Sequence, residues 1–172
     1  MHVSSRLKTP LTLAGFIILP LLVGVIGAVF TTSAIPAWYA TLAKPWFAPP
    51  NWLFGPAWTV LYVLMGIASF LVYQKRETDP RADGALKVYG LQLGLNFLWS
   101  LIFFGLRSIL GGFIEIVLLW VVIIVTIRRF YQISPTAGLL LIPYLAWVTF
   151  ASILNFGILQ LNVPFPFTGM TK

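Results

Sequence analysis

The sequence predicts an all-α integral membrane protein: a single bundle of five transmembrane helices with a long ordered loop between the first two. The first reason is composition, because 59% of the 172 residues are hydrophobic and only 9% are charged. A soluble domain carries about 25% charged residues. The second reason is five apolar segments, each of at least about 17 residues, which is enough to cross a hydrocarbon core of about 30 Å as a helix. Backbone polar groups in lipid must be paired within such a segment, so these segments are predicted to be helical rather than extended.

The predicted helices, in order, cover residues 11–30, 53–73, 88–104, 110–127 and 137–161. They form one transmembrane domain over residues 1–162, followed by a tail at 163–172 with no helical pattern. The first segment has a second interpretation as a signal peptide, since basic residues precede it and Thr32-Ser33-Ala34 loosely resembles a cleavage site. Its apolar stretch of about 20 residues is long for a signal peptide, which favours a transmembrane helix.

The positions of the basic residues predict the orientation. Eight lysines and arginines lie on the side of the N-terminus and of the second and fourth connections: Arg6, Lys8, Lys75, Arg76, Arg81, Lys87, Arg128 and Arg129. Three lie on the other side: Lys44, Arg107 and Lys172. By the positive-inside rule, we expect a multi-pass protein of a bacterial cell membrane, with the N-terminus cytoplasmic and the C-terminus and first loop outside.

Composition also excludes several functions. The net charge of +7 does not indicate nucleic-acid binding, because the basic residues lie at segment ends and form no basic helix face. There is no cysteine, the single histidine is His2, and only four residues are acidic. We therefore expect no disulfide, no metal site and no acid–base catalytic set, and no required cofactor.

The first connection, residues 31–52, is rich in both aromatic residues and proline, including Trp38, Tyr39, Trp46 and Pro49. Proline fixes φ, so this loop is expected to be stiff. It is either an aromatic belt at the headgroups or a lid over a ligand cavity. The length of the stiffened segment favours the lid, since long irregular loops in compact domains usually have a function.

Few polar residues lie within the predicted helices. Gln92 and Asn96 are on the third, Asn155 is on the fifth, and Glu115 is about one turn into the fourth, from where it could reach the outer interface. Intramembrane polar residues face the bundle interior and often mark sites. Each asparagine is therefore either an interhelical hydrogen-bonding residue or a ligand contact.

The depths of these residues favour a site in the outer half of the bundle. Trp58 lies about 9 Å below the outer end of its helix at 1.5 Å per residue, and Trp99 lies at a similar depth. On the fifth segment, Tyr144, Trp147, Ala151 and Asn155 form one helical stripe. An aromatic pocket with few polar groups suits a flat hydrophobic ligand.

Small residues at helical spacing predict close helix contacts. Gly90 and Gly94 form a GxxxG pair on the third segment, and Gly24 and Ala28 have the same spacing on the first. Such pairs let two helix backbones approach closely. We expect Gly90 and Gly94 to lie in a homodimer interface, with packing inside the bundle as the alternative.

Two stretches of the sequence resemble the TspO/MBR family of tryptophan-rich sensory and translocator proteins. Residues 38–50 read WYATLAKPWFAPP, and residues 143–155 read PYLAWVTFASILN. Between them, further matches are Trp58, Leu61-Tyr62, Met65-Gly66, Leu95-Asn96, Trp99 and Phe103-Phe104. The resemblance covers about residues 11–162.

This resemblance implies five transmembrane helices, a homodimer, and binding of porphyrins such as protoporphyrin IX or haem, or of other hydrophobic ligands, beneath the first loop. Together with the pattern of the sequence, it predicts a ligand-binding set of Trp38, Tyr39, Trp46, Pro49, Trp58, Tyr62, Asn96, Trp99, Tyr144, Trp147, Ala151 and Asn155. The alternative it implies is an enzyme for light- or oxygen-dependent porphyrin breakdown, acting through Trp58 and Trp147. The expected partners are the hydrophobic ligand, membrane lipid and a second copy of the chain.

Overall fold

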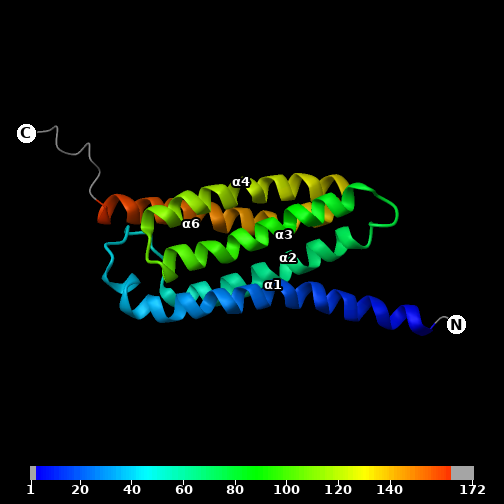
Figure 1. Cartoon of the computed structure of the whole chain (residues 1–172), viewed down its shortest axis with the longest axis horizontal. Helices are drawn as coiled ribbons and strands as arrows, with labels where there is room; N and C mark the ends of the chain where they lie inside the picture. The colour runs from blue at the N-terminus through cyan, green and yellow to red at the C-terminus, as the bar shows by residue number, and fades with distance from the viewer. Residues whose placement is uncertain (1–2, 164–172) are drawn as a thin grey trace, which may run out of the picture.

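The computed structural model describes residues 3–163, and within them it confirms an all-helical bundle (Figure 1). Five stretches are long and apolar enough to cross a membrane: Thr9–Ala37, Asn51–Tyr73, Arg81–Gly105, Ile109–Ile133 and Pro135–Asn162. No strand occurs in the described part of the chain. The chain is a multi-pass membrane protein.

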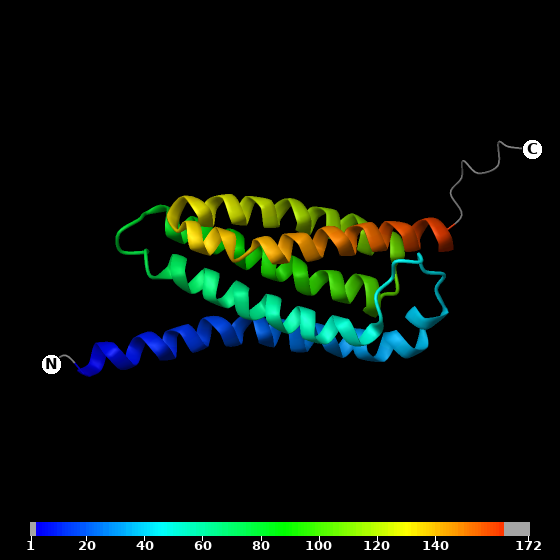
Figure 2. The same cartoon turned by 180° about the vertical axis from the view of Figure 1, so that it is seen from behind.

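The helices are α1 (Val3–Ala37), α2 (Phe54–Tyr73), α3 (Arg81–Ser100), α4 (Ile109–Ile133), α5 (Pro135–Leu139) and α6 (Ile142–Asn162). Short 3-10 turns occupy Tyr39–Thr41 and Asn51–Leu53 between α1 and α2, and a π-turn, Leu101–Gly105, ends α3. The α2–α3 turn lies at the same end of the bundle as the N-terminus. The first loop lies at the opposite end with the end of α6 (Figure 2).

Several predicted boundaries are wrong, because apolar length marks the lipid-facing part of a helix and not its ends. The first helix continues past residue 30 to Ala37, which shortens the first loop to 38–53. The hydroxyls of Thr31 and Thr32 donate to the carbonyls of Gly27 and Ala28, four residues earlier, so these polar residues stay helical. The α3 helix starts at Arg81 and not at 88, and α4 runs to Ile133 and not to 127.

The fifth segment is divided, which the sequence prediction missed. The helix α5 ends at Leu139, and α6 begins at Ile142. Pro143 follows this break and has no N–H to give to a carbonyl one turn earlier, so a continuous helix would leave that carbonyl unpaired. The predicted tail at 163–172 lies outside the described residues, apart from Val163.

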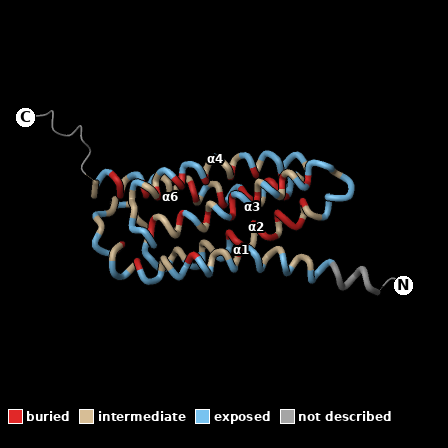
Figure 3. The backbone as a smooth tube through the Cα atoms, viewed as in Figure 1, coloured by how far each residue is buried: buried red, intermediate tan, exposed pale blue. Residues whose placement is uncertain are grey.

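The core lies between α2, α3, α4 and α6 (Figure 3). On α3 the buried positions include Ala82, Ala85, Tyr89, Gln92, Asn96 and Trp99, a spacing of three to four residues that keeps one helix face inward. In contrast, α1 is the outermost helix. Only 11% of its most apolar stretch is buried, whereas 33–44% of the corresponding stretch is buried in each of the other four spans. Most of the surface of α1 is therefore left to lipid.

Candidate functional site

Three helices meet at a hydrogen-bonded polar centre inside the bundle. The Tyr62 hydroxyl on α2 donates to Asn96 Oδ1 on α3 at 2.6 Å. The side-chain amides of Asn96 and Gln92 both donate to the Tyr144 hydroxyl on α6, each at 3.1 Å. Tyr144 is fully buried. These bonds show that Asn96 joins helices by hydrogen bonds, which is the first of the two roles predicted for it.

A pocket of about 440 Å³ lies beside this centre, between α1, α2 and α3. Its aromatic lining is Trp52, Phe54, Trp58, Tyr62, Trp99 and Phe104, and its polar lining includes Asn51, Thr59 and Ser100. Gly24 of α1 is required for its shape, since a Cβ there would lie 2.2 Å from the Tyr62 ring. The small residues Gly24 and Ala28, which predict close helix contacts, thus belong to the α1 wall of the pocket.

Aromatic contacts fix the rings around the pocket. Trp58 stacks on Tyr62 with ring centroids 5.4 Å apart and contacts the edge of Tyr144 at 6.1 Å. Trp99 stacks on Phe103 at 5.4 Å with an interplanar angle of 11°. Aromatic pairs in such geometry are worth about 0.5–1.5 kcal/mol beyond the area they bury. The indoles are held in place before any ligand binds.

The first loop is anchored to the end of the bundle where α6 finishes. Lys44 Nζ donates to the carbonyls of Tyr39 at 2.8 Å and Leu42 at 3.0 Å, and it lies 4.8 Å from the centre of the Tyr39 ring. Asn162, at the end of α6, exchanges two hydrogen bonds with the backbone of Ala43. Tyr39 itself is buried against Phe103 and Phe104, and this burial raises the pKa of its hydroxyl.

The structure brings part of the predicted ligand set together. Trp58, Tyr62 and Trp99 line the pocket, and Asn96 and Tyr144 lie directly behind it in the polar centre. Trp38 and Tyr39 pack on Phe103, and Pro49 is half-buried in the loop. Trp46 is 96% exposed and does not reach the pocket.

The remaining predicted residues are on α6, away from the pocket lining. Trp147 packs on Phe54 at 6.1 Å and on Phe150 at 5.8 Å, and Ala151 is half-buried. Asn155 is buried against Gly112 of α4. The expectation that Glu115 reaches the outer interface is wrong, because its side chain is turned into the bundle and the residue is 5% exposed.

Asn51, Trp52, Ser100 and Phe104 also line the pocket, although they are absent from the predicted ligand set. Trp52 and Phe104 were visible in the sequence as aromatic residues at the outer ends of the second and third segments. Nothing in the sequence shows that α1 contributes one wall of the pocket, because the packing of α1 against α2 depends on how the Tyr62 ring lies against Gly24.

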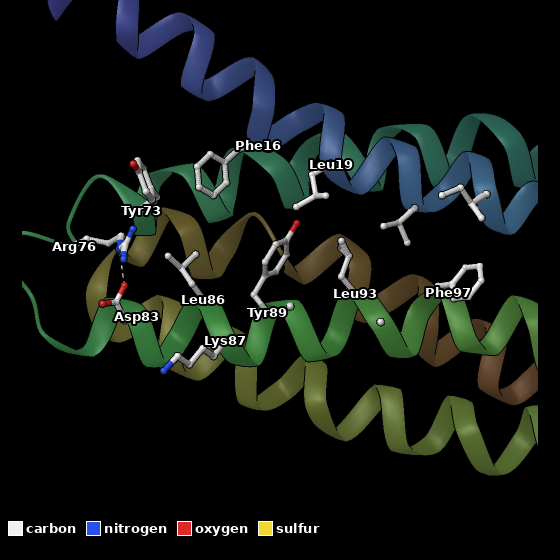
Figure 4. A pocket seen from close by; sticks show the side chains of 14 residues that line it. Phe16, Leu19, Tyr73, Arg76, Asp83, Leu86, Lys87, Tyr89, Leu93 and Phe97 are labelled. Carbon is white, nitrogen blue, oxygen red and sulfur yellow. Dashed lines mark hydrogen bonds and ion pairs between the residues drawn. The ribbon is translucent and has the colours of Figure 1, made fainter.

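A second and larger hollow, of about 860 Å³, lies on the outside of the bundle between α1 and α3 (Figure 4). Its lining is mostly apolar, with Phe16, Leu19, Leu93 and Phe97 along its length, and the Arg76–Asp83 ion pair of 2.5 Å at one end. Gly90 and Gly94 also line it, and a Cβ on either would meet nothing within 4 Å. Packing of these two glycines inside the bundle, the alternative to a dimer contact, is therefore wrong.

Known proteins resemble this chain over most of its length. The profile of the TspO/MBR family matches residues 16–161. The tryptophan-rich protein TspO of Archaeoglobus fulgidus is 46% identical over 153 residues, covering 88% of this chain and 97% of that protein. The TspO protein of Chlorobaculum tepidum is 46% identical over 155 residues, covering 90% and 98%. The translocator protein of Bos taurus is 38% identical over 149 residues, covering 86% and 88%. With a family match across most of its length and relatives aligned nearly end to end, the chain belongs to the TspO/MBR family.

Proposed function

We propose that this protein is a membrane receptor, sensor or transporter that binds porphyrins or other flat hydrophobic ligands. The observation that carries the proposal is the convergence of Trp58, Tyr62 and Trp99 on one pocket. Its volume of about 440 Å³ lies within the range of small-molecule sites, and such sites are mostly apolar with a few placed polar groups. The names of relatives, such as the tryptophan-rich sensory protein of Cereibacter sphaeroides, agree with a sensory role.

In this proposal the indoles of Trp58 and Trp99 stack on the face of the macrocycle. The Asn96 amide, already bonded to Tyr62, lies behind the aromatic wall and binds the polar edge of the ligand after a change of partner. Trp147 of α6 adjoins the site through Phe54, which lines the pocket, and the end of the first loop contributes Asn51 and Trp52 to it. No bound cofactor is required for this function, and the porphyrin is a ligand.

Quenching of tryptophan fluorescence by protoporphyrin IX in lipid vesicles tests this proposal. We expect saturable quenching, and a Kd that rises roughly 2–10-fold when Trp99→Leu removes a stacking surface worth about 0.5–1.5 kcal/mol. Trp120→Leu is the matched control, since Trp120 lies on α4 and bonds Thr149 away from the pocket. Absence of quenching in the unaltered protein, or equal losses in both variants, would count against the pocket.

Porphyrin breakdown is the alternative function, and the placement of Trp58 in the pocket wall is the observation that favours testing it. Illumination of the complex in air separates the two functions. A new absorbing product that is lost in Trp58→Phe and Trp147→Phe indicates an enzyme, and an unaltered porphyrin spectrum indicates binding alone.

We also propose that two copies associate through the α3 face that carries Gly90 and Gly94. These glycines are exposed and unobstructed, and such a face lets the helix backbones of two copies approach closely. Crosslinking in native membranes should lose the dimer in the double variant Gly90→Leu, Gly94→Leu. Gly15→Leu, on an equally open part of α1, is the control.

The orientation, with the N-terminus cytoplasmic and the first loop outside, is a further part of the proposal. Because the chain has no cysteine, a single introduced cysteine can be labelled without background. A membrane-impermeant maleimide added to intact cells should label Ala40→Cys in the first loop and spare Glu77→Cys in the α2–α3 turn. The reverse pattern would invert the topology.

A further inference from the structure

Glu115 is a buried carboxyl group without a partner. It is 5% exposed, and neither carboxyl oxygen has a hydrogen-bond partner. The two ion pairs among the described residues, Arg76–Asp83 and Arg81–Asp79, do not involve it. An ionised carboxyl group in hydrocarbon is costly unless it is paired, so the surroundings of Glu115 favour its neutral, protonated form.

Asn155 presents a second unpartnered group across the same helix seam. It is 1% exposed, and neither Nδ2 nor Oδ1 has a partner. Its Nδ2 lies 3.3 Å from the position that a Cβ on Gly112 would take. Gly112 precedes Glu115 by three residues, so the two lie on the same face of α4. The unpartnered carboxyl and the unpartnered amide therefore share the α4–α6 seam.

The neighbours of this seam that contacts trace among the described residues are uncharged. Tyr144 of α6 is buried and accepts from Asn96 and Gln92. Tyr62 of α2 is bonded to Asn96, Tyr39 of the first loop packs on Phe103, and the π-turn contributes the Phe103 ring beside Gly112. Arg107, the nearest basic residue along the chain, is exposed in the turn before α4.

We propose that Glu115 and Asn155 form a proton-binding site inside the membrane. Glu115 holds the proton as a carboxylic acid that donates its O–H to Asn155 Oδ1, and Asn155 Nδ2 donates to the other carboxyl oxygen, directly or through one water. The donors and acceptors of an acid and an amide match in this way, which satisfies both groups. Loss of the proton leaves an unpaired charge in the seam and weakens the packing of α4 on α6.

Infrared spectroscopy in lipid vesicles tests the proton, because the chain has only four acidic residues. The other three, Glu77, Asp79 and Asp83, lie at or beside the turn between α2 and α3. We expect the carbonyl stretch of a protonated carboxyl group at pH 7, its loss in Glu115→Gln and its retention in Glu77→Gln. The unaltered protein alone is decisive if the variant does not fold: no such band at pH 7 overturns the proposal, as does a band that survives in Glu115→Gln.

The role of Asn155 has its own measurement. We expect Asn155→Leu to shift the band to higher frequency, because the carbonyl of the acid loses a donated hydrogen bond. Asn162→Leu, at the outer end of the same helix and bonded to Ala43, should leave the band in place. An unshifted band in Asn155→Leu would remove Asn155 from the site. Neither measurement requires a porphyrin, so the outcome is independent of the proposed function.

Discussion

Two polar clusters lie inside this bundle, and they differ in how fully their groups are paired. In the polar centre, Tyr62, Asn96, Gln92 and Tyr144 are connected by three hydrogen bonds, and only Gln92 Oε1 is left without a partner. In the α4–α6 seam, all four polar side-chain atoms of Glu115 and Asn155 lack partners. Both clusters are buried to a similar extent. Burial alone therefore does not explain the difference.

The difference in pairing indicates that buried polar side chains have two different roles in this bundle. A hydrogen-bonded cluster stabilises one arrangement of helices, since each group would be costly to expose to lipid alone. An unbonded cluster gains nothing from its present arrangement and is free to bind a proton, a water or a ligand. The polar centre is therefore the structural element that positions the pocket, and the seam is the element that can change state.

The largest expected effect is at the polar centre. Tyr144→Phe removes the acceptor of two hydrogen bonds, which leaves Asn96 Nδ2 without a partner and Gln92 Nε2 with only its weak contact to Met65 Sδ, and it should lower the free energy of unfolding by about 1–3 kcal/mol. Denaturation by sodium dodecyl sulfate in mixed micelles measures it. Tyr131→Phe, at a 52% exposed position on α4, is the control and should change little. Equal stability of the two variants would mean that the centre does not hold the helices together.

The next effect concerns how tightly the seam is packed. A Cβ on Gly112 would lie 2.7 Å from Phe103 Cδ2, so Gly112→Ala should destabilise the fold by roughly 1–2 kcal/mol through overpacking. Gly15→Ala, where a Cβ meets nothing, should instead stabilise α1 by about 0.5–1 kcal/mol through helix propensity. If both substitutions stabilise the protein, the seam has spare room, and the missing bonds of Asn155 reflect loose packing.

A smaller effect is expected for Asn155→Leu. The structure shows no hydrogen bond from its amide to protein atoms, and the proposed bonds to Glu115 join two transmembrane helices, so the free energy of unfolding should change by no more than roughly 0.6 kcal/mol per bond. Asn96→Leu, which breaks two bonds, is the contrasting variant on α3. A loss for Asn155→Leu as large as that for Asn96→Leu would erase the distinction between the two clusters.

The fold could be predicted from the sequence because lipid imposes a simple rule on it. Apolar length identifies five spans, and these are confirmed. The ends were missed because they depend on local bonds: the hydroxyls of Thr31 and Thr32 extend α1, and Asp79 at the start of α3 accepts from Arg81. Hydropathy contains no information on these hydrogen bonds.

The site was predictable in part, for a related reason. The tryptophan and asparagine spacing predicts a site in one half of the bundle, and Trp58, Tyr62 and Trp99 do line a pocket at the end that carries the first loop. The α1 wall and the inward turn of Glu115 were not predictable, because helix rotation is set by packing around Gly24 and Gly112. Polarity suggested that Glu115 reaches the interface, but the seam between α4 and α6 encloses it.

The smallest effect is at the surface, where the carboxyl group of Asp79 has a cationic partner, which Glu115 lacks. The Arg81 side chain donates to both carboxyl oxygens, at 2.9 and 2.7 Å, and its backbone N–H donates to Oδ1 at 2.9 Å. These bonds lower the pKa of Asp79 to about 2. Since the pKa in the folded state is the lower one, the stabilisation of the start of α3 is complete above about pH 4. It is lost as the pH falls through about 2.

Hydrogen exchange of the first-turn amides of α3 should accelerate over that pH window, after correction for the intrinsic pH dependence of exchange. Arg81→Gln should raise the titration midpoint of Asp79 toward its ordinary value and move the window upward with it. An Asp79 that titrates near pH 4 in the unaltered protein would show that the bonds to Arg81 do not persist in solution. Observed together, a surface carboxyl group kept charged by a cationic partner and a buried one kept neutral without a cationic partner would establish that pairing, more than position, sets the state of the acidic side chains in this protein.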